Sequence, residues 1–561
     1  AGGPFIDKRL AILGGSTTAD LRALLELFLL GAGIRPTFFE SEYNRFYEDA
    51  VVDGAALEAF GPDVVLVHTT WHNVTRWPEP RASADEVEVL LAAELQRFEA
   101  LWERLLSRGS CIVVQNNFDL PPLESLGHLG ASACYGHTRY VERLNAAFAA
   151  AAEKEPRLHL NDIARLAARV GLDEWASLKW WFHAKMAVTP QAAAALAHQA
   201  AKIVRSAYGR TRKCLVLDLD NTLWGGVVGD DGVAGLKLGN DHPEGEAYTA
   251  FQRYCLELKR RGVLLAVCSK NDPEVARSGF SHPDSVLKVE DFAAFEASWE
   301  PKPEGLRSIA RQLNLGLDSL VFVDDNPFER ELVAQSLPEV CVAKVGEVTR
   351  FAEVLDREGH FEPFSLTADD LPRAALYAAD QERARARGSF ESYEQYLQWL
   401  EMRAEIAPFS PTYLERITQL INKTNQFNLT TTRHTLAEVT AMAQSPEHLT
   451  LYGKLKDRFG DNGLVSVIIA RTLGDAAHID TWLMSCRVLK RSFEQAMFAA
   501  LCEAAAARGV KRLVGRYLPT AKNAMVASHY AQLGFRPLGD GSWEYVIAER
   551  PPPPPTWIER S

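Results

Sequence analysis

Short apolar runs recur along the first part of the chain, and longer amphipathic stretches separate them. "LAIL", "PDVVLVH" and "CIVVQNN" are apolar runs of strand length, with helical sequence between them. Continuous apolar runs, as opposed to alternating ones, are typical of strands that are buried on both faces of a parallel sheet. The pattern predicts a doubly wound α/β domain over residues 1–205.

The hydrophobic pattern after this domain predicts three further parts. "CLVLDLD", "VLLAVCSK" and "SLVFVDD" indicate a second parallel α/β core over residues 206–350. Residues 351–402 are charged and helical, as in a linker, and residues 403–550 carry longer strands and a long helix, as in a mixed α+β domain. A proline run within 551–561 predicts a stiff polyproline II tail. The fold class is therefore α/β, in several domains.

Composition and charge narrow the classes of function. The chain has 561 residues, enough for three or four domains, and is 47% hydrophobic. Its net charge of −12 argues against a nucleic-acid binder, and its eight cysteines form no CxxC pair that would suggest a zinc site. Neither a signal peptide nor an apolar run of membrane-spanning length is present, so we expect a cytoplasmic protein without a membrane partner.

Two acidic residues follow directly on a buried strand in "KCLVLDLDNTLWGGVVGDDG". The strand ends at Leu217, and Asp218 and Asp220 project from its carboxyl end, where open α/β sheets place their ligands. Burying both carboxylates without a partner would cost several kcal/mol. A cation is therefore expected beside the pair, whereas a turn with solvated acids fits poorly because the segment continues before any glycine appears.

Three more polar positions follow in the same core. Ser269 ends the next strand, Lys302 precedes a helix, and Asp325 ends a third strand. All lie at carboxyl ends of strands or just before a helix, so they can converge on one crevice. This order resembles the haloacid-dehalogenase (HAD) superfamily of aspartate-nucleophile phosphotransferases.

The resemblance implies a role for each of these residues. Asp218 would form an aspartyl-phosphate, and Asp220 would protonate the leaving oxygen and later activate water. Ser269 and Lys302 would hold the phosphoryl oxygens. A bound Mg²⁺ would neutralise the approach of like charges, with ligands expected from Asp218, Asp220 (through its backbone carbonyl), Asp324 and Asp325.

The core has little room for a cap domain. Only about fifty residues separate Asp218 from Ser269, whereas larger relatives carry a cap there. We therefore expect an open site that serves a bulky or tethered phosphate.

Longer motifs narrow the resemblance. "LGGSTTADL", "FESEYNRFY", "PKPEGLRSIARQLNLGLDSLVFVDDNPFERE" and "INKTNQFNLTT" are similar to the FkbH-like family of glyceryl transferase/phosphatases. Membership implies that 1,3-bisphosphoglycerate supplies a glyceryl thioester, that the remaining phosphate is removed, and that an acyl carrier protein receives the glyceryl unit. Such units feed polyketide biosynthesis.

A thioester needs a thiol, and two cysteines are candidates. Cys268 precedes Ser269, where Mg²⁺, Lys270 and Lys302 would favour its thiolate. Strand alternation, however, turns Cys268 away from the Ser269 side chain, as expected of an ordinary buried cysteine. Cys486 in the last domain is the rival, and Lys270 and Asn271 are candidate contacts for the substrate or carrier.

The first domain resembles SGNH hydrolases, with Ser16 in the nucleophile position. His183 is the candidate base, but Trp180 occupies the place of the aspartate that would orient it, while Asn116 could serve the oxyanion. Because the triad is incomplete, we expect a structural or docking domain.

The last domain resembles GNAT acyltransferases, with Tyr530 in the position of the acid. The loop that begins at Arg487 lacks the glycines that let backbone amides approach a diphosphate, which favours a phosphopantetheine arm over CoA. Residues 486–522 hold eight Lys/Arg against two Glu, so they could attract an acidic carrier protein or simply form a solvated face.

The sequence thus predicts a HAD-type glyceryltransferase/phosphatase. A HAD phosphatase acting on a small metabolite or phosphoprotein, and a non-enzymatic docking scaffold for carrier proteins, are the alternatives.

Overall fold

The computed structural model describes residues 5–107, 109–366, 379–380, 382–383, 386–520, 522–539, 541–547 and 557–560. The chain divides into two compact units. The first comprises residues 3–210 with 434–440, and the second comprises residues 211–433 with 441–561. Within the described residues, no helix has the length and apolar content needed to cross a membrane.

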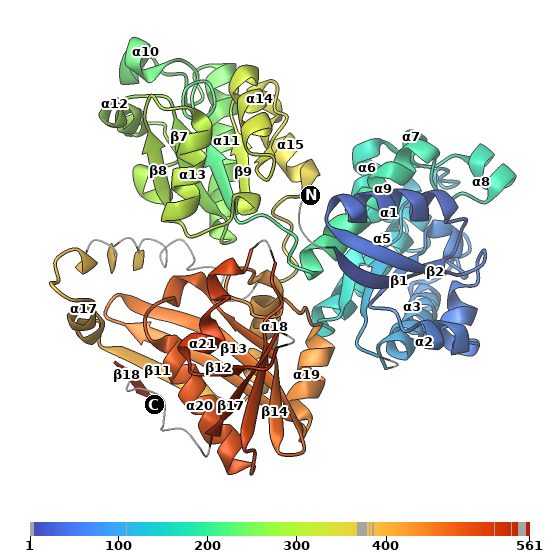
Figure 1. The fold of residues 1–561 in the computed structure, drawn as a ribbon. Helices are drawn as coiled ribbons and strands as arrows, with labels where there is room; N and C mark the ends of the chain where they lie inside the picture. The colour runs from blue at the N-terminus through green and yellow to red at the C-terminus, as the bar shows by residue number, and fades with distance from the viewer. Residues whose placement is uncertain are drawn as a thin grey trace. The chain divides into compact units, whose positions relative to one another are not determined.

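The N-terminal domain is a parallel five-stranded sheet in the order β2-β1-β3-β4-β5. Figure 1 labels its strands β1 and β2. Its strands are β1 (Ile6–Gly14), β2 (Ile34–Glu40), β3 (Val64–His68), β4 (Ile112–Asn116) and β5 (Leu158–Asn161). Its helices are α1 (Ala19–Gly31), α2 (Ala55–Phe60), α3 (Ala84–Ser107), α4 (Leu129–Ser132), α5 (His137–Lys154), α6 (Ile163–Val170), α7 (Leu172–Trp175), α8 (Leu178–Ala184) and α9 (Pro190–Ala207). The strand order reverses between β1 and β3, and the carboxyl ends at such a reversal form a crevice.

The central domain is a second parallel sheet, in the order β10-β9-β6-β7-β8. Its strands are β6 (Cys214–Leu217), β7 (Leu264–Ser269), β8 (Ala294–Ala297), β9 (Leu320–Val323) and β10 (Cys341–Val342). Its helices are α10 (Val228–Gly235), α11 (Pro243–Arg260), α12 (Pro273–Ser278), α13 (Lys302–Gln312), α14 (Pro327–Ser336) and α15 (Phe351–Glu358). The order reverses between β6 and β9, which places the ends of these two strands side by side. Only α10 and α11 lie between Asp218 and Ser269, where a larger cap would be inserted.

Alternate residues of the central strands pack on opposite faces of the sheet. Leu215 and Leu217 of β6 belong to one buried cluster, and Val216 belongs to another. Each strand is thus buried on both faces, which is why its sequence is continuously apolar.

Two of the helices in the described part of the predicted linker 351–402 pack in different cores. Phe351 and Leu355 of α15 are buried in the central domain, whereas Tyr396 and Leu397 of α17 (Tyr393–Trp399) are buried in the C-terminal domain. Residues 367–378 of the linker lie outside the described residues, as does the proline run 551–555.

The C-terminal domain is an eight-stranded sheet in the order β16-β17-β15-β14-β13-β12-β11-β18. Neighbouring strands are antiparallel except β14–β15 and β11–β18, so the domain is of the mixed α+β type. Its strands are β11 (Met402–Ala407), β12 (His448–Asp457), β13 (Gly460–Leu473), β14 (Ala476–Met484), β15 (Arg512–Arg516), β16 (Arg536–Pro537), β17 (Ser542–Val546) and β18 (Ile558–Arg560). Its remaining helices are α18 (Leu414–Lys423), α19 (Leu436–Gln444), α20 (Phe493–Ala507) and α21 (His529–Gln532).

Candidate active site

Three carboxylates meet where the strand order of the central sheet reverses. Asp218 follows β6, and Asp324 and Asp325 follow β9; one carboxylate oxygen of each lies within 4.8 Å of the others. Asp324 is fully buried, and only 13% of the Asp218 side chain is exposed. Oxygen donors crowded in this way are a fitting set for a hard divalent cation, and the Asp220 side chain is not part of the set.

Lys302 neutralises part of this charge. It is the first residue of α13, is 3% exposed, and extends Nζ between two carboxylates, 2.6 Å from Oδ1 of Asp218 and 3.1 Å from Oδ2 of Asp324. Nζ also donates to the carbonyl of Cys268 at 2.7 Å. Burial opposes the ammonium charge, but Asp218 and Asp324 nevertheless raise the pKa of Lys302 above its usual value. A permanently charged ammonium at this place can hold a phosphoryl oxygen.

Burial and the negative charge of neighbouring acids both favour the neutral form of the carboxyl groups. Burial, with the Asp218 charge second, raises the pKa of Asp324 to about 6 and also raises the pKa of Asp325. The Thr222 side chain accepts from the Asp325 backbone N–H at 3.1 Å and lies 3.4 Å from Oδ1 of Asp325. Thr222 belongs to the "DNT" of the first motif, and its place two residues after Asp220 is the sequence signal for this contact.

Three donors hold the carboxylate of Asp220. Its Oδ1 accepts from Nε1 of Trp224 at 2.9 Å and from the Val228 backbone at 3.0 Å, and its Oδ2 accepts from Nδ2 of Asn271 at 3.1 Å. Burial, followed by the Asp218 charge, raises the pKa of Asp220. A carboxyl with a raised pKa and a fixed orientation is suited to moving a proton. Asn271, predicted as a substrate or carrier contact, orients Asp220 in this structure.

The residues around β7 have different surroundings. Ser269 is the last residue of β7 and is 5% exposed. Nζ of Lys270 lies 2.7 Å from Oε1 of Glu329 on α14, so Lys270 forms an ion pair with a neighbouring helix.

Of the two interpretations of Cys268, the structure supports the ordinary buried cysteine and contradicts the favoured thiolate. Cys268 is 2% exposed and belongs to the buried cluster that includes Val216, on the face opposite Leu217. Its Sγ lies 3.7 Å from the carbonyl of Lys302, and burial raises its pKa to about 12. Strand alternation therefore decides the position of this thiol, and the nearby lysine charge does not compensate for the loss of water.

In the N-terminal domain, the partner of Ser16 is His68, and the prediction of His183 is wrong. Oγ of Ser16 lies 3.0 Å from Nε2 of His68, which ends β3, whereas His183 is exposed on α8. The prediction of an oxyanion role for Asn116 is also wrong, because Nδ2 of Asn116 lies 2.9 Å from Nδ1 of His68. Asn161 extends this series of hydrogen bonds, because its Nδ2 donates to Oδ1 of Asn116 at 2.8 Å.

This network joins the ends of four strands and is closed to solvent. Ser16 and His68 are each 2% exposed, and burial lowers the pKa of His68 to about 4, so the ring is neutral. With the Asn116 amide donating to Nδ1, Nε2 carries the proton and donates it to Ser16. In this tautomer His68 does not take the serine proton. The arrangement supports our expectation of a structural domain, which stays a prediction. His68 follows no sequence motif, so only the fold could identify it.

The predicted contacts of the C-terminal domain do not form one open site. Tyr530 is 1% exposed inside the apolar core, and burial raises its pKa, so the prediction of Tyr530 as a substrate or carrier contact is wrong. Nε of Arg487 donates to Oγ of Ser485 at 3.2 Å. The side chain of Cys486 lies outside the described residues. Arg491, counted in the basic segment, is 7% exposed and pairs with Asp457 at 3.0 Å.

Comparison with known proteins places the first part of the chain. Residues 9–205 match the family model of the FkbH N-terminal domain. This part of the chain is therefore similar to FkbH N-terminal domains. A solved structure of the N-terminal part of BF1531 from Bacteroides fragilis, which contains a phosphatase domain and is complexed with Mg, is 29% identical with a TM-score of 0.60. The match covers 64% of this protein and 96% of the BF1531 chain.

Weaker likenesses also exist. The ribosomal-protein-S18-alanine N-acetyltransferase from Escherichia coli is 17% identical with a TM-score of 0.21, over 26% of this chain and 94% of that chain. The PaiA N-acetyltransferase from Thermoplasma acidophilum, in complex with coenzyme A, is 14% identical with a TM-score of 0.21. This match covers 26% of this protein and 99% of the PaiA chain. At these scores neither supports a conclusion about activity. No curated protein matches the chain. The predicted resemblance to the FkbH-like family is confirmed over residues 9–205, and the α/β multidomain fold class is confirmed.

Proposed function

We propose that this protein is a Mg²⁺-dependent HAD-type enzyme that loads a glyceryl unit from 1,3-bisphosphoglycerate onto an acyl carrier protein and removes the remaining phosphate. The assignment to HAD-family phosphatases and transferases rests on the FkbH domain and on the BF1531 phosphatase-domain likeness. The observation that carries the proposal is Lys302, placed between Asp218 and Asp324 with Asp325 alongside. These groups can hold a phosphoryl group between an anionic nucleophile and an ammonium.

The dephosphorylation is assigned to Asp218 and Asp220. A carboxylate oxygen of Asp218 attacks phosphorus, the bond from phosphorus to the glyceryl oxygen breaks, and Asp220 gives that oxygen its proton. Water then attacks the aspartyl-phosphate, Asp220 takes a proton back, and phosphate leaves. Lys302 pairs with the phosphoryl oxygens throughout.

The carboxylates of Asp218, Asp324 and Asp325, with the backbone carbonyl of Asp220, would hold Mg²⁺. All are oxygen donors, which suit this cation. When bound, it would reduce the repulsion between the nucleophile and the phosphate charge.

The acyl step needs no cysteine of the HAD core. The burial of Cys268 favours direct attack by the thiol of the carrier's phosphopantetheine arm on the acyl phosphate. A C–S bond forms, the bond from the acyl carbon to the phosphate oxygen breaks, and inorganic phosphate leaves with the thiol proton going to solvent. The absence of a large insertion between β6 and β7 leaves room for a tethered substrate.

The intact mass of the carrier tests the proposal. Wild-type protein, Mg²⁺, 1,3-bisphosphoglycerate and a holo-carrier should give carrier with one glyceryl group and no phosphate. Cys268→Ala should load equally well, and Asp218→Asn should leave phosphoglyceryl carrier. Unmodified carrier with every candidate would reject glyceryl transfer, and loss of loading in Cys268→Ala or Cys486→Ala alone would return the thioester to that cysteine.

A further inference from the structure

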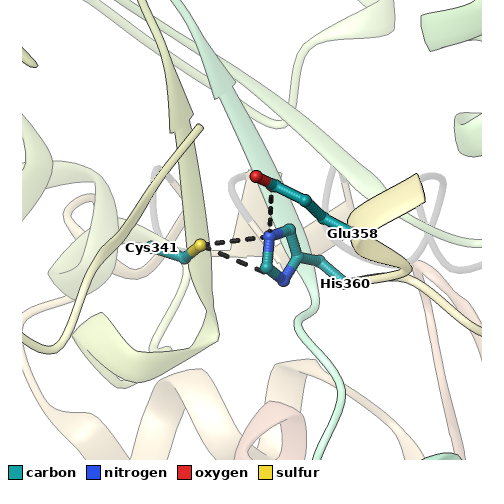
Figure 2. A group of neighbouring side chains, drawn as sticks. All are labelled: Cys341, Glu358 and His360. Atoms are coloured by element: carbon teal, nitrogen blue, oxygen red, sulfur yellow. Dashed lines mark hydrogen bonds and ion pairs between the residues drawn. The ribbon is translucent and has the colours of Figure 1, made fainter. Parts of the chain in front are cut away.

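A second group of metal-ligating side chains lies at the edge of the central sheet. It consists of Cys341 on the edge strand β10, Glu358 at the end of α15, and His360 (Figure 2). One donor atom from each lies within 4.8 Å of the others. Gly359, in the left-handed region at φ 60°, ends α15 and turns the chain, so that Glu358 and His360 come together.

The way in which the three donors meet distinguishes a cation site from a catalytic relay. Sγ of Cys341 lies 3.2 Å from Nε2 of His360, and Oε2 of Glu358 lies 2.7 Å from the same nitrogen. In a thiol–imidazole–carboxylate relay, the thiol and the carboxylate contact opposite ring nitrogens. Here Oε2 contacts Nε2, and Sγ lies nearer to Nε2 than to Nδ1, from which it is 3.9 Å away, so the three donors crowd together as ligands around one ion do (Figure 2).

The donor types and distances suit zinc. Sulfur, imidazole nitrogen and carboxylate oxygen are the ligands that Zn²⁺ takes, and bond lengths of about 2.0–2.3 Å place tetrahedral donors roughly 3.5 Å apart. An ion therefore needs the three donors to separate by less than about 1 Å. The side chains of His360 and Glu358 are 15% and 33% exposed, so metal and water can reach them.

The surroundings keep this group in place and apart from the carboxylates. The backbone N–H of Arg212 donates to the carbonyl of His360 at 2.8 Å, and Phe351 anchors α15 in the core. Cys341 pairs in register with Val321, three residues before Asp324. At the strand rise of about 3.3 Å per residue, the two groups lie about 10 Å apart along the strand direction.

We propose that Cys341, Glu358 and His360 form a zinc site, with water as fourth ligand, that ties the edge strand β10 to the end of α15. This site takes a softer metal than the three carboxylates, because it alone offers sulfur and nitrogen. The two sites can therefore be loaded and tested separately.

Cobalt tests the proposal directly, because a thiolate bound to Co²⁺ gives a charge-transfer band in the near ultraviolet. The full chain is stripped with chelator, returned to excess Mg²⁺ to fill the carboxylates, and titrated with Co²⁺ or Zn²⁺. We expect the cobalt band, its loss on addition of Zn²⁺, about one zinc per chain after gel filtration, and a higher Tm with zinc.

Cys341→Ser and His360→Gln should lose the band, the bound zinc and the zinc-dependent rise in Tm, while Glu358→Gln keeps the shape and weakens zinc binding. Cys134→Ser, which changes a half-buried cysteine of the N-terminal domain, is the matched control and should behave as wild type. Circular dichroism in Mg²⁺ alone shows that each variant is folded. No cobalt band in the wild type, or a band that survives in Cys341→Ser, overturns the proposal.

Discussion

At the residue scale, the candidate site is a set of charges balanced against one another. Lys302 contacts two acids directly, and Asp220 is held by three donors that leave it oriented beside them. The nucleophile and the acid/base therefore differ in their surroundings: Asp218 has an ammonium partner, and Asp220 has neutral hydrogen-bond donors. Such a difference separates the roles of two neighbouring carboxyl groups.

Asp220→Asn tests the proton-transfer role. We expect phosphate release to fall roughly 10²–10⁴-fold, because the amide has the same shape but cannot give or take the proton. Steady-state phosphate release and circular dichroism measure activity and folding. Asp230→Asn, which changes an exposed acid of α10 in the same domain, should keep the wild-type rate. A rate in Asp220→Asn close to that of the control would remove Asp220 from the mechanism.

The acids and the lysine of this site could be predicted from the sequence, because their positions relative to the strands and helices determine where they lie in a parallel sheet. Asp218, Asp324 and Lys302 follow strands or begin helices, so the fold class alone brings them together. The sequence left the role of Cys268 open, because its electrostatic surroundings favour a thiolate while its strand position buries it. His68 was missed because its contact with Ser16 exists only in three dimensions.

At the element scale, histidines that the N-terminal domain encloses fully or in part make its stability depend on pH. Burial lowers the pKa of His68, His72 and His159 from 6.5 to about 4. Between these values the unfolded chain binds more protons, so stability is full above pH 6.5 and is lost as the pH falls toward 4. Asp119, whose pKa burial raises to about 6, acts in the opposite direction, but one acid does not outweigh three histidines.

The Tm of the N-terminal domain should therefore fall as the pH is lowered from 7 to 4. His68 alone contributes about 3 kcal/mol over this window, since one pKa unit corresponds to about 1.4 kcal/mol. Thermal unfolding followed by circular dichroism should show a shallower decline in His68→Gln than in the wild type. His183→Gln changes an exposed histidine and should follow the wild-type curve. Equal slopes in all three proteins would show that His68 is not buried in its neutral form.

The packing of Tyr530 against β15 can be tested separately. A Cβ added at Gly515 would lie 2.3 Å from the Tyr530 ring, so we expect Gly515→Ala to destabilise the C-terminal domain by roughly 1–3 kcal/mol. Denaturant unfolding measures the change. Gly346→Ala is the control, because an added Cβ there has no neighbour within 4 Å. An unchanged midpoint for Gly515→Ala would mean that Tyr530 is free to move, as an acid at an open site would be.

At the scale of the whole molecule, the chemistry is concentrated in the central domain. Its sheet brings the carboxylates together, while Ser16, His68 and Tyr530 of the other domains are enclosed. The sequence predicted the parallel sheets because continuous apolar runs leave few alternatives. It could not predict which polar side chains the flanking domains enclose, because burial depends on packing between distant segments.

Phosphate release should require a divalent metal that the carboxylates of the central domain bind. Chelation with EDTA should abolish phosphate release from phosphoglyceryl carrier and Mg²⁺ should restore it, because the single charge of Lys302 does not balance the three carboxylates that the phosphate approaches. Asp325→Ala should raise the Mg²⁺ concentration needed for half-maximal rate, and Asp230→Ala should leave it unchanged. A full rate in the presence of chelator would show that these carboxylates do not act through a metal.

The proposed mechanism depends most on Asp218, whose carboxylate accepts the phosphoryl group. The direct measurement is phosphate release from phosphoglyceryl carrier by Asp218→Asn beside wild type, with the intact mass of acid-quenched protein recorded in the same reactions. We predict that wild-type protein carries one phosphoryl group during turnover of this substrate, and that Asp218→Asn keeps its fold, carries none and releases no phosphate from it. Phosphate release by Asp218→Asn at a rate near that of the wild type would contradict the account.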